Sequence, residues 1–198
     1  MKLVKMFGLA VIAAAALMAF VGAGTASATT LTCNGATCPA GTLITAEAES
    51  KVVLHPPFGS IECSKSHVEG KTNNAGSAAE TVNGSISTLS FSECNATVTV
   101  LTKGALEIHA ISGTSDGTVT SNGTEVTVEY LGFHCIFKTS NTDIGRLTGS
   151  NTTKTEHATF DISATIPRTG GRSGAFCGST AQWTGAYKIT TPTKLNVH

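Results

Sequence analysis

The residues Gly113-Thr-Ser115-Asp-Gly117 match the G-x-S-x-G pattern, in which a serine can act as the nucleophile of a hydrolase. That chemistry requires a strand before the serine and a helix after it, so that the hydroxyl is exposed beside backbone donors for an oxyanion. Here Thr118-Val119-Thr120 continues as a strand instead. We therefore interpret Ser115 as part of a turn, and an exported hydrolase is the least favoured function.

Three glutamates on alternating segments are candidates for carboxylate chemistry. Glycoside hydrolysis needs two carboxylates that flank one bond, and Glu107, Glu125 and Glu129 could supply them if their strands were neighbours. Solvated strand faces explain these residues more simply. His109 lies two positions after Glu107, on the same face of a strand, so we interpret the two as an exposed polar pair.

The histidines and cysteines do not have metal-ligand or redox spacing. The six histidines form neither an H-x-H nor an H-E-x-x-H pair, and the six cysteines contain no Cys-x-x-Cys motif. His134 adjoins Cys135, but a disulfide-bonded cysteine cannot act as a nucleophile. We expect no metal, no cofactor and no catalytic residue, and therefore no enzyme.

Two aromatic residues form a candidate ligand platform. Trp183 and Tyr187 are four positions apart in an expected strand, so both point to one face, with Gly185 between them. If exposed, they could form a flat surface on which a sugar ring stacks. If buried, they are the largest core residues, and the core interpretation is favoured because aromatic residues make up only 6% of the chain.

The cysteines are expected to form structural disulfides. Six cysteines allow fifteen pairings, and the sequence alone does not choose among them. The pairing that we expect is Cys33 with Cys38, Cys63 with Cys94, and Cys135 with Cys177. The first bridge would close a small loop around a turn. The other two would tie strands across long loops, where each contributes roughly 3 to 4 kcal/mol.

Residues 1–28 have the layout of a secretory signal peptide. Two lysines precede an apolar run from Leu9 to Val21, and small residues then lead to a cleavage site after Ala28. The run is shorter than the ~20 apolar residues of a transmembrane helix. We expect a secreted protein, extracellular or at the cell surface, with residues 29–198 as one domain and no integral membrane segment after cleavage.

Length and charge limit the classes of partner. Removing 28 of the 198 residues leaves 170, which suits a single domain. The loss of two of the thirteen basic residues leaves eleven against thirteen acidic residues, and they form no cluster. Nucleic acid requires a concentrated positive field, so it is excluded as a partner.

Apolar residues recur at every second position along the body of the chain, mostly with threonine and valine, which predicts strands. The clearest strands are expected at Ala96–Thr102, Leu106–Ile111, Glu125–Tyr130, Phe133–Lys138, Phe160–Ile166 and Gln182–Thr190. In the fifth, apolar residues share one face and polar residues the other, as in a half-buried strand. Pro167 is expected to end it, because proline lacks a ladder donor.

Turn residues and strand spacing predict the fold class. Asn83-Gly84 and Asn122-Gly123 each lie between alternating segments and are expected to be hairpin turns. Strands that recur every ~8 to 12 residues are typical of a β-sandwich or a barrel. We favour an all-β, disulfide-stabilised antiparallel β-sandwich, because few bulky interior residues suit a thin layer between two sheets better than a wide lumen.

Four short motifs are distinctive: Ser92-Glu-Cys-Asn-Ala-Thr-Val98, Thr142-Asp-Ile-Gly145 with Leu147-Thr-Gly149, Asp161-Ile-Ser-Ala-Thr-Ile-Pro167 and Gln182-Trp-Thr-Gly185. With these motifs the chain resembles a group of small secreted actinobacterial proteins, rich in threonine and glycine, that have no assigned activity. The resemblance covers the chain from about Cys63 onward. It implies a bacterial exported protein and no substrate or catalytic residue.

Two functions from different classes fit these features. The first is a non-catalytic secreted or cell-surface binding protein, with a cell-envelope polysaccharide or a protein as its partner. The second is a structural subunit of an extracellular matrix or filament, which self-associates because an edge strand pairs with the next copy. The segment Thr42–Leu54 is the candidate edge strand. The sequence identifies neither the ligand nor the biological process.

Overall fold

The computed structural model describes residues 28–150, 156–172 and 174–198. Apart from Ala28, the expected signal peptide lies outside these residues. The strands are β1 (Thr29–Cys33), β2 (Ala36–Thr37), β3 (Leu43–Ala48), β4 (Val52–His55), β5 (Ile61–Thr72), β6 (Gly76–Ser77), β7 (Val82–Cys94), β8 (Thr97–Thr102), β9 (Ala105–Ala110), β10 (Gly117–Asn122), β11 (Glu125–Tyr130), β12 (Phe133–Lys138), β13 (Thr142–Thr148), β14 (Thr159–Gly170), β15 (Thr180–Thr191) and β16 (Leu195–Val197), and a single-turn helix, α1, spans Gly174–Cys177.

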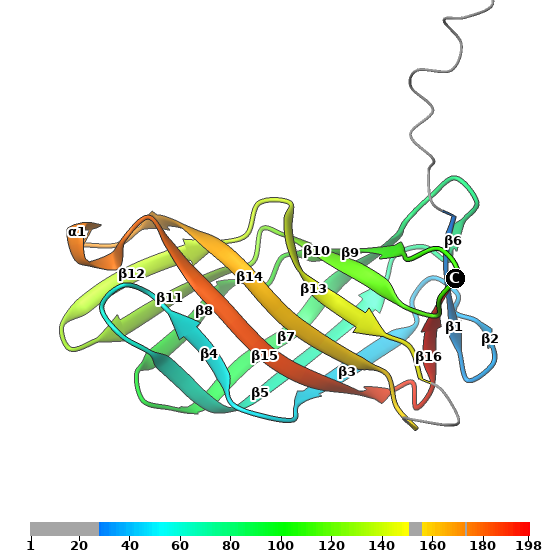
Figure 1. Ribbon diagram of the computed structural model, residues 1–198, viewed down its shortest axis with the longest axis horizontal. Coiled ribbons are helices and arrows are strands. Elements are labelled where there is room, and N and C mark those ends of the chain that lie inside the picture. Colours follow the sequence, from blue (N-terminus) through cyan, green and yellow to red (C-terminus); the bar gives the residue numbers. More distant parts are fainter. Residues whose placement is uncertain (1–27, 151–155, 173) are drawn as a thin grey trace, which may run out of the picture.

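Most of these elements join into long strands that run obliquely along the protein (Figure 1). β3 continues into β4, β8 into β9, β10 into β11 and β12 into β13, while β5, β7, β14 and β15 are long and continuous. Successive long strands are antiparallel, so the chain forms an up-and-down meander. The alternation of apolar and polar residues therefore gives every strand one face inside and one outside. All six strands expected from the sequence are present.

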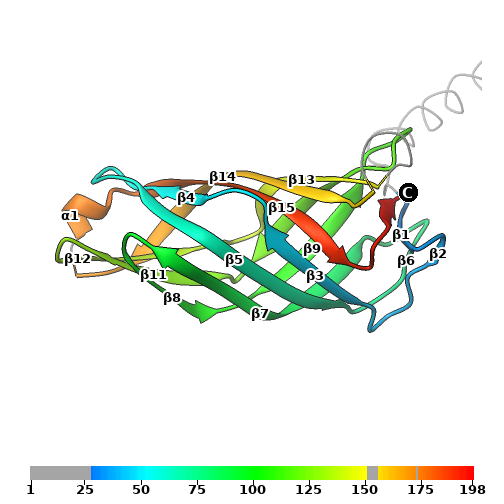
Figure 2. The same cartoon turned by 90° about the horizontal axis from the view of Figure 1, so that it is seen from below.

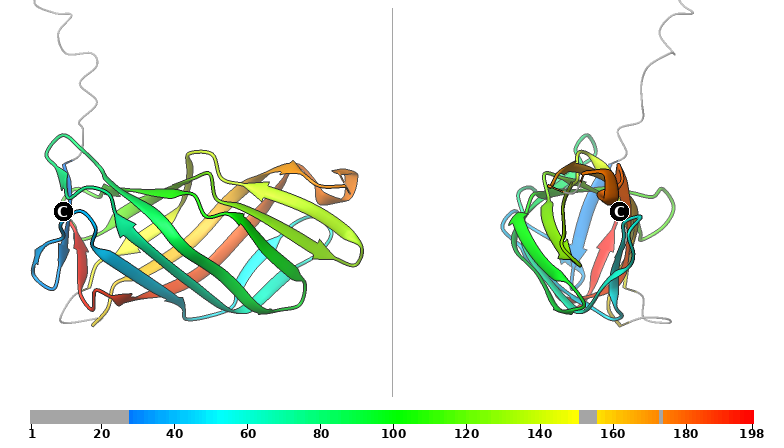
Figure 3. Two further views of the ribbon diagram at one scale, coloured as in Figure 1. Left: turned by 180° about the vertical axis from the view of Figure 1, so that it is seen from behind. Right: turned by 90° about the vertical axis from the view of Figure 1, so that its left-hand side faces the viewer.

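The sheet closes on itself into an eight-stranded barrel. β3 pairs with β5 on one side and with β15 on the other. The closed ring consists of β3, β5, β7, β9, β10, β13, β14 and β15. Figure 2 shows β3, β5 and β7 side by side, and the end view in Figure 3 shows the strands around the axis.

The expected β-sandwich is therefore wrong, whereas the all-β class and the disulfides are confirmed. An eight-stranded barrel is just wide enough for side chains to fill. Valine, isoleucine and leucine can do so without many bulky residues, so the scarcity of aromatic residues does not argue against a barrel. The segment Thr42–Leu54 is likewise not a free edge, because its strands β3 and β4 each pair with both β5 and β15.

Three of the long strands break at one level, which we call the waist. The breaks separate β8 from β9, β10 from β11 and β12 from β13. The Ser121 hydroxyl lies 3.0 Å from the hydroxyls of both Thr124 and Thr139. The Thr124 hydroxyl donates to the backbone oxygen of Lys103 at 2.8 Å. These buried hydroxyls bond to one another and to backbone groups at the breaks. Either kind of group would be costly to bury without a hydrogen-bond partner.

The turns differ from those expected. Asn83-Gly84 lies inside β7 and pairs with β9, so the predicted hairpin there is wrong. Gly123 has the positive φ of a turn, 79°, but it joins β10 to β11, which continue in the same direction as one long strand. The hairpin expected at Asn122-Gly123 is therefore wrong as well. The β11–β12 hairpin instead turns at Leu131-Gly132, with φ values of 50° and 86°. Leucine rarely adopts this conformation, so its sequence gives no turn signal.

β14 has the expected half-buried pattern but continues past Pro167. Ile162, Ala164 and Ile166 are buried, and the residues between them are exposed. The Arg168 N–H donates to Ser179 on the side of β15, so the nitrogen of Pro167 faces the other side. There β14 pairs with β13 before Pro167 and with β12 after it, but not at Pro167 itself. The missing donor therefore costs no ladder bond.

Different structures lie at the two ends of the barrel. At one end, which we call the plug, β1 pairs with β16, β2 and β6, and Leu31, Leu195 and Val197 are fully buried. At the opposite end, the ring of Phe133 lies 5.4 Å from that of Phe58 and 5.0 Å from that of Phe176.

Within the described ranges, no helix has the length and apolar character needed to cross a membrane.

The disulfides pair as expected from the sequence. They are Cys33–Cys38 in the plug, Cys63–Cys94 between facing positions of β5 and β7, and Cys135–Cys177 between β12 and α1. Such bridges are typical of proteins in oxidising compartments outside the cytoplasm.

Of the Cys63–Cys94 and Cys33–Cys38 bridges, the first closes the longer loop and is expected to stabilise the fold more. Its two cysteines are 31 positions apart, against 5 for the plug bridge. Cys63→Ala with Cys94→Ala should lower the free energy of unfolding by about 4 kcal/mol, and Cys33→Ala with Cys38→Ala by about 2 kcal/mol. Urea denaturation of both double variants measures the difference, and equal losses would contradict the loop-entropy explanation.

Candidate functional site

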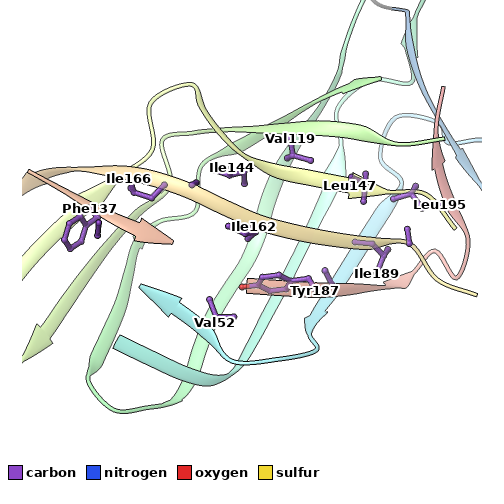
Figure 4. Packing of buried hydrophobic residues seen from close by; sticks show 14 of the residues in the cluster. Val52, Val119, Phe137, Ile144, Leu147, Ile162, Ile166, Tyr187, Ile189 and Leu195 are labelled. Atoms are coloured by element: carbon purple, nitrogen blue, oxygen red, sulfur yellow. The ribbon is translucent and has the colours of Figure 1, made fainter. Parts of the chain in front are cut away.

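The half of the barrel next to the plug contains a cavity of about 110 Å³, which we call the large cavity. Its wall includes Ile44, Val68, Ile108, Val119, Ile144 and Ile162, each from a different strand. Leu195 of the plug also lines it. Figure 4 shows Val119, Ile144 and Ile162 among the interior side chains. The alternation of inward and outward residues in all the long strands therefore produces one apolar chamber.

Small residues on β3, β5 and β7 leave part of this space unfilled. Ala46, Gly70 and Gly84 line the large cavity. A β-carbon added to Gly70 would lie 2.7 Å from the backbone oxygen of Ser85, and one added to Gly84 would lie 3.2 Å from that of Lys71. The close approach of β5 to β7 thus favours glycine at both positions. The consequence is that Gly70 and Gly84 add no side chain to this part of the wall.

A second cavity, of about 50 Å³, lies on the other side of the waist, and we call it the small cavity. Leu54, Ile61, Val128 and Phe137 line it, and all four are apolar. Three further residues, Leu89, Thr124 and Trp183, line both cavities. The two chambers therefore lie end to end in the lumen.

The two residues of the candidate platform face this interior. Tyr187 is 1% exposed, and Trp183 is partly buried. Both line the large cavity. Gly185 between them leaves room for Val52, because an added β-carbon would lie 3.3 Å from a Val52 methyl carbon. The pair thus belongs to the wall of the lumen, and the buried Tyr187 ring provides no outer surface for a sugar to stack on.

The phenol of Tyr187 introduces a polar group beside the large cavity. Its hydroxyl donates to the Ser66 hydroxyl at 2.9 Å, which in turn donates to the backbone oxygen of Ser90 at 2.9 Å. Burial raises the pKa of Tyr187 to about 12, because the phenolate loses its hydration, and the hydrogen bond to Ser66 opposes this only in part. The phenol therefore stays neutral and hydrogen-bonded near neutral pH.

One wall of the small cavity lacks a strand ladder. Within the described ranges, β8 pairs with β11 alone, and β7 pairs with β5 and β9 but not with β8. We call the boundary between residues 87–94 of β7 and β8 the seam. Leu89 and Phe91 on one side of the seam and Val98 on the other line the small cavity. The seam therefore borders the lumen directly.

The seam is tied at its waist end. The Ile86 N–H donates to the backbone oxygen of Gly104 at 3.3 Å. The Lys103 ammonium donates to the backbone oxygen of Ser87 at 2.6 Å. At the opposite end, the chain itself joins β7 to β8 through residues 95–96. Both ends of the seam are thus held, while the strands between them are not bonded to each other in a ladder.

The G-x-S-x-G residues form a turn at the plug. Residues 111–116 connect β9 to β10, and a strand rather than a helix follows, as expected. The Ser115 carbonyl accepts the N–H of Val197 in β16. The Asp116 carboxylate accepts hydrogen bonds from Arg146 at 2.6 Å and from the Gly149 N–H at 2.9 Å. These contacts fasten the turn to the plug and to β13, so its residues have a structural explanation.

The three glutamates do not come together. Glu107 lies on β9, between β7 and β10, whereas Glu125 and Glu129 lie on β11, between β8 and β12. Glu107 lies 3.6 Å from the ring nitrogen of His109, as expected for a polar pair on one face. In the described part of the chain, no group of three or more histidine, cysteine or acidic side chains could hold a metal ion.

Comparison of the chain with models of known protein families, with curated proteins and with solved structures gives no match.

Sequence reasoning located Trp183 and Tyr187 but not the cavities. Their walls take residues from many strands, and the same aliphatic residues would fill a solid core. The usable signal was glycine inside alternating segments, at Gly70 and Gly84, which marks close backbone approach. At Gly84 that signal was instead interpreted as a hairpin turn.

The raised pKa of Tyr187 predicts a loss of stability in alkali. The unfolded phenol ionises near its ordinary value of 10, while the folded one keeps its proton up to about 12. The unfolded state therefore binds fewer protons between these values, and stability falls as the pH rises through them. Tyr187→Phe should remove this dependence and Tyr130→Phe should retain it. Urea denaturation at pH values on both sides of 10 measures it, and an unchanged slope in Tyr187→Phe would refute the assignment.

The seam predicts uneven backbone protection. β8 and β11 are neighbouring strands of the same length, but β11 pairs on both sides and β8 on one. Backbone amides on the seam side of β8 should therefore exchange with solvent faster than those of β11. Hydrogen–deuterium exchange of peptides that cover the two strands tests this, and equal protection would show that the seam is closed in solution.

Proposed function

We propose that the protein is an exported, non-catalytic binding protein that holds a small apolar molecule inside its barrel. The observation that carries this proposal is the pair of apolar cavities, about 110 Å³ and 50 Å³, in the lumen. Protein interiors are close-packed, and voids of this size lose dispersion contacts unless something occupies them. Apolar cavities of similar volume stay dry and bind small apolar molecules.

The volumes limit the size of the ligand. Sites for drug-sized molecules occupy ~300 to 1,000 Å³, which is well above the large cavity. A single aromatic ring or a short alkyl chain is the appropriate size. The hydroxyls of Ser121, Thr124 and Thr139 are bonded to one another or to backbone, so they offer little to a polar ligand. Burial of apolar surface would therefore provide most of the affinity.

The other expected partners receive less support. A polysaccharide would need exposed aromatic faces, and Tyr187 lies inside the barrel. A filament built by exchange of Thr42–Leu54 would require opening the barrel between β3 and both of its neighbours. Export is part of the proposal, supported by three disulfides and by the layout of residues 1–28.

A substitution that fills the large cavity tests the proposal. Ala46→Phe places an aromatic ring on the cavity wall, whereas Ala105→Phe places the same ring on the exposed side of β9. The wild type and Ala105→Phe should bind toluene or hexanol, and Ala46→Phe should lose at least tenfold in affinity. The fluorescence of Trp183, the single tryptophan of the chain, reports occupancy directly.

Two controls make this test decisive. Urea denaturation checks that Ala46→Phe is folded, because overpacking can cost ~1 to 3 kcal/mol. If that variant does not fold, Val119→Phe fills the same cavity from β10. If the wild type binds neither toluene nor hexanol, or if a folded cavity-filled variant binds as well as the wild type, the proposal is wrong.

A further inference from the structure

The large and small cavities lie in line on either side of the waist. Leu89, Thr124 and Trp183 line both and therefore stand between them. Both chambers have apolar walls. A ring-shaped molecule would fill one chamber only, whereas a narrow, flexible molecule could extend from one into the other.

We infer that the two cavities form one elongated site for a linear alkyl chain, with Leu89 as the movable side chain between them. This inference rests on the proposed function. It adds the shape of the ligand, the direction in which it lies and the residue that must move. The chain would lie along the barrel axis, with the large cavity holding one part and the small cavity the other.

The positions of the three dividing residues explain why Leu89 is the one that moves. Thr124 is held by hydrogen bonds, because its hydroxyl donates to the backbone oxygen of Lys103 and its N–H donates to the Thr139 hydroxyl. Trp183 lies on β15, where it pairs with Ala164 of β14 and with Leu54 of β4. Leu89 pairs with Val68 of β5 on one side only, because its other side faces the seam. A residue held by one ladder can shift at lower cost than one held by two. A ligand can therefore displace Leu89 without breaking the strand ladder of the barrel.

The seam also gives such a chain a route into the lumen. Leu89 and Phe91 of β7 and Val98 of β8 form both the margin of the seam and the wall of the small cavity. Separating β7 from β8 breaks no ladder bond in the described residues. The plug closes the opposite end of the lumen with fully buried side chains such as Leu31. Entry through the small cavity is thus the less costly path.

A chain-length series tests the inference. The n-alkanols from butanol to dodecanol are titrated into the wild type, Leu89→Ala and Leu106→Ala, with Trp183 fluorescence as the readout. Leu106 lines the large cavity but not the small one, so the two variants lose the same atoms but only Leu89→Ala removes a side chain that stands between the cavities. Burying each methylene should raise affinity about fourfold until the available space is filled.

The expected result is a difference that depends on chain length. Short alkanols, which fit the large cavity, should bind Leu89→Ala and Leu106→Ala equally. Longer ones should bind Leu89→Ala at least tenfold more tightly than Leu106→Ala, because the Leu89 side chain no longer has to be displaced. Toluene should not distinguish the two variants. If the variants have the same profile at every length, the inference is wrong.

Failure of this inference can be told apart from failure of the proposed function. If short alkanols and toluene bind the wild type but longer chains gain nothing in Leu89→Ala, the lumen binds ligands and the cavities remain separate. If nothing binds the wild type, both are wrong. Urea denaturation confirms that each variant is folded, and Leu89→Val, which removes fewer atoms, replaces Leu89→Ala if the latter unfolds.

Discussion

The double pairing of β3 is the constraint on which the rest of the structure depends. β3 is six residues long, yet it pairs with β5 and β15 at once. If it were absent, β5 and β15 would become edges in the half of the barrel that β3 closes, and β4 would join them only in the other half. The closure joins the first long strand of the described chain to the last. It is therefore a contact between distant segments, which forms slowly because a large loop must close first.

Hydrogen bonds among the buried hydroxyls at the waist allow the cavities on either side to stay apolar. Three strands break at the waist, and their breaks expose backbone groups inside the barrel. Ser121, Thr124 and Thr139 bond to those groups and to one another. Since their hydrogen-bonding capacity is used within this network, the adjoining chambers can remain apolar and dry. The same hydroxyls fix the level at which the lumen is divided.

Local patterns predicted the strands better than their arrangement. The period of two in segments such as Glu125–Tyr130 depends only on neighbouring residues, so it could be read directly. Closure depends on which distant strands pair, and β3 has the same alternation in a barrel as in a sandwich. The inward position of Trp183 and Tyr187 followed from the scarcity of aromatic residues. The cavities did not, because they arise from the summed volumes of side chains on many strands.

The seam has a consequence for the solubility of the protein. β8 reads Thr-Val-Thr-Val-Leu-Thr, six residues with high β-propensity, no charge and no proline or glycine. Segments of this kind assemble into cross-β fibrils when their backbone is free to pair. Lys103 follows it immediately and bonds to β7, which is the position of a charged gatekeeper. The barrel thus contains a strand of high β-propensity that pairs on one side only, and the same lysine that ties the seam supplies a charge at the end of that strand.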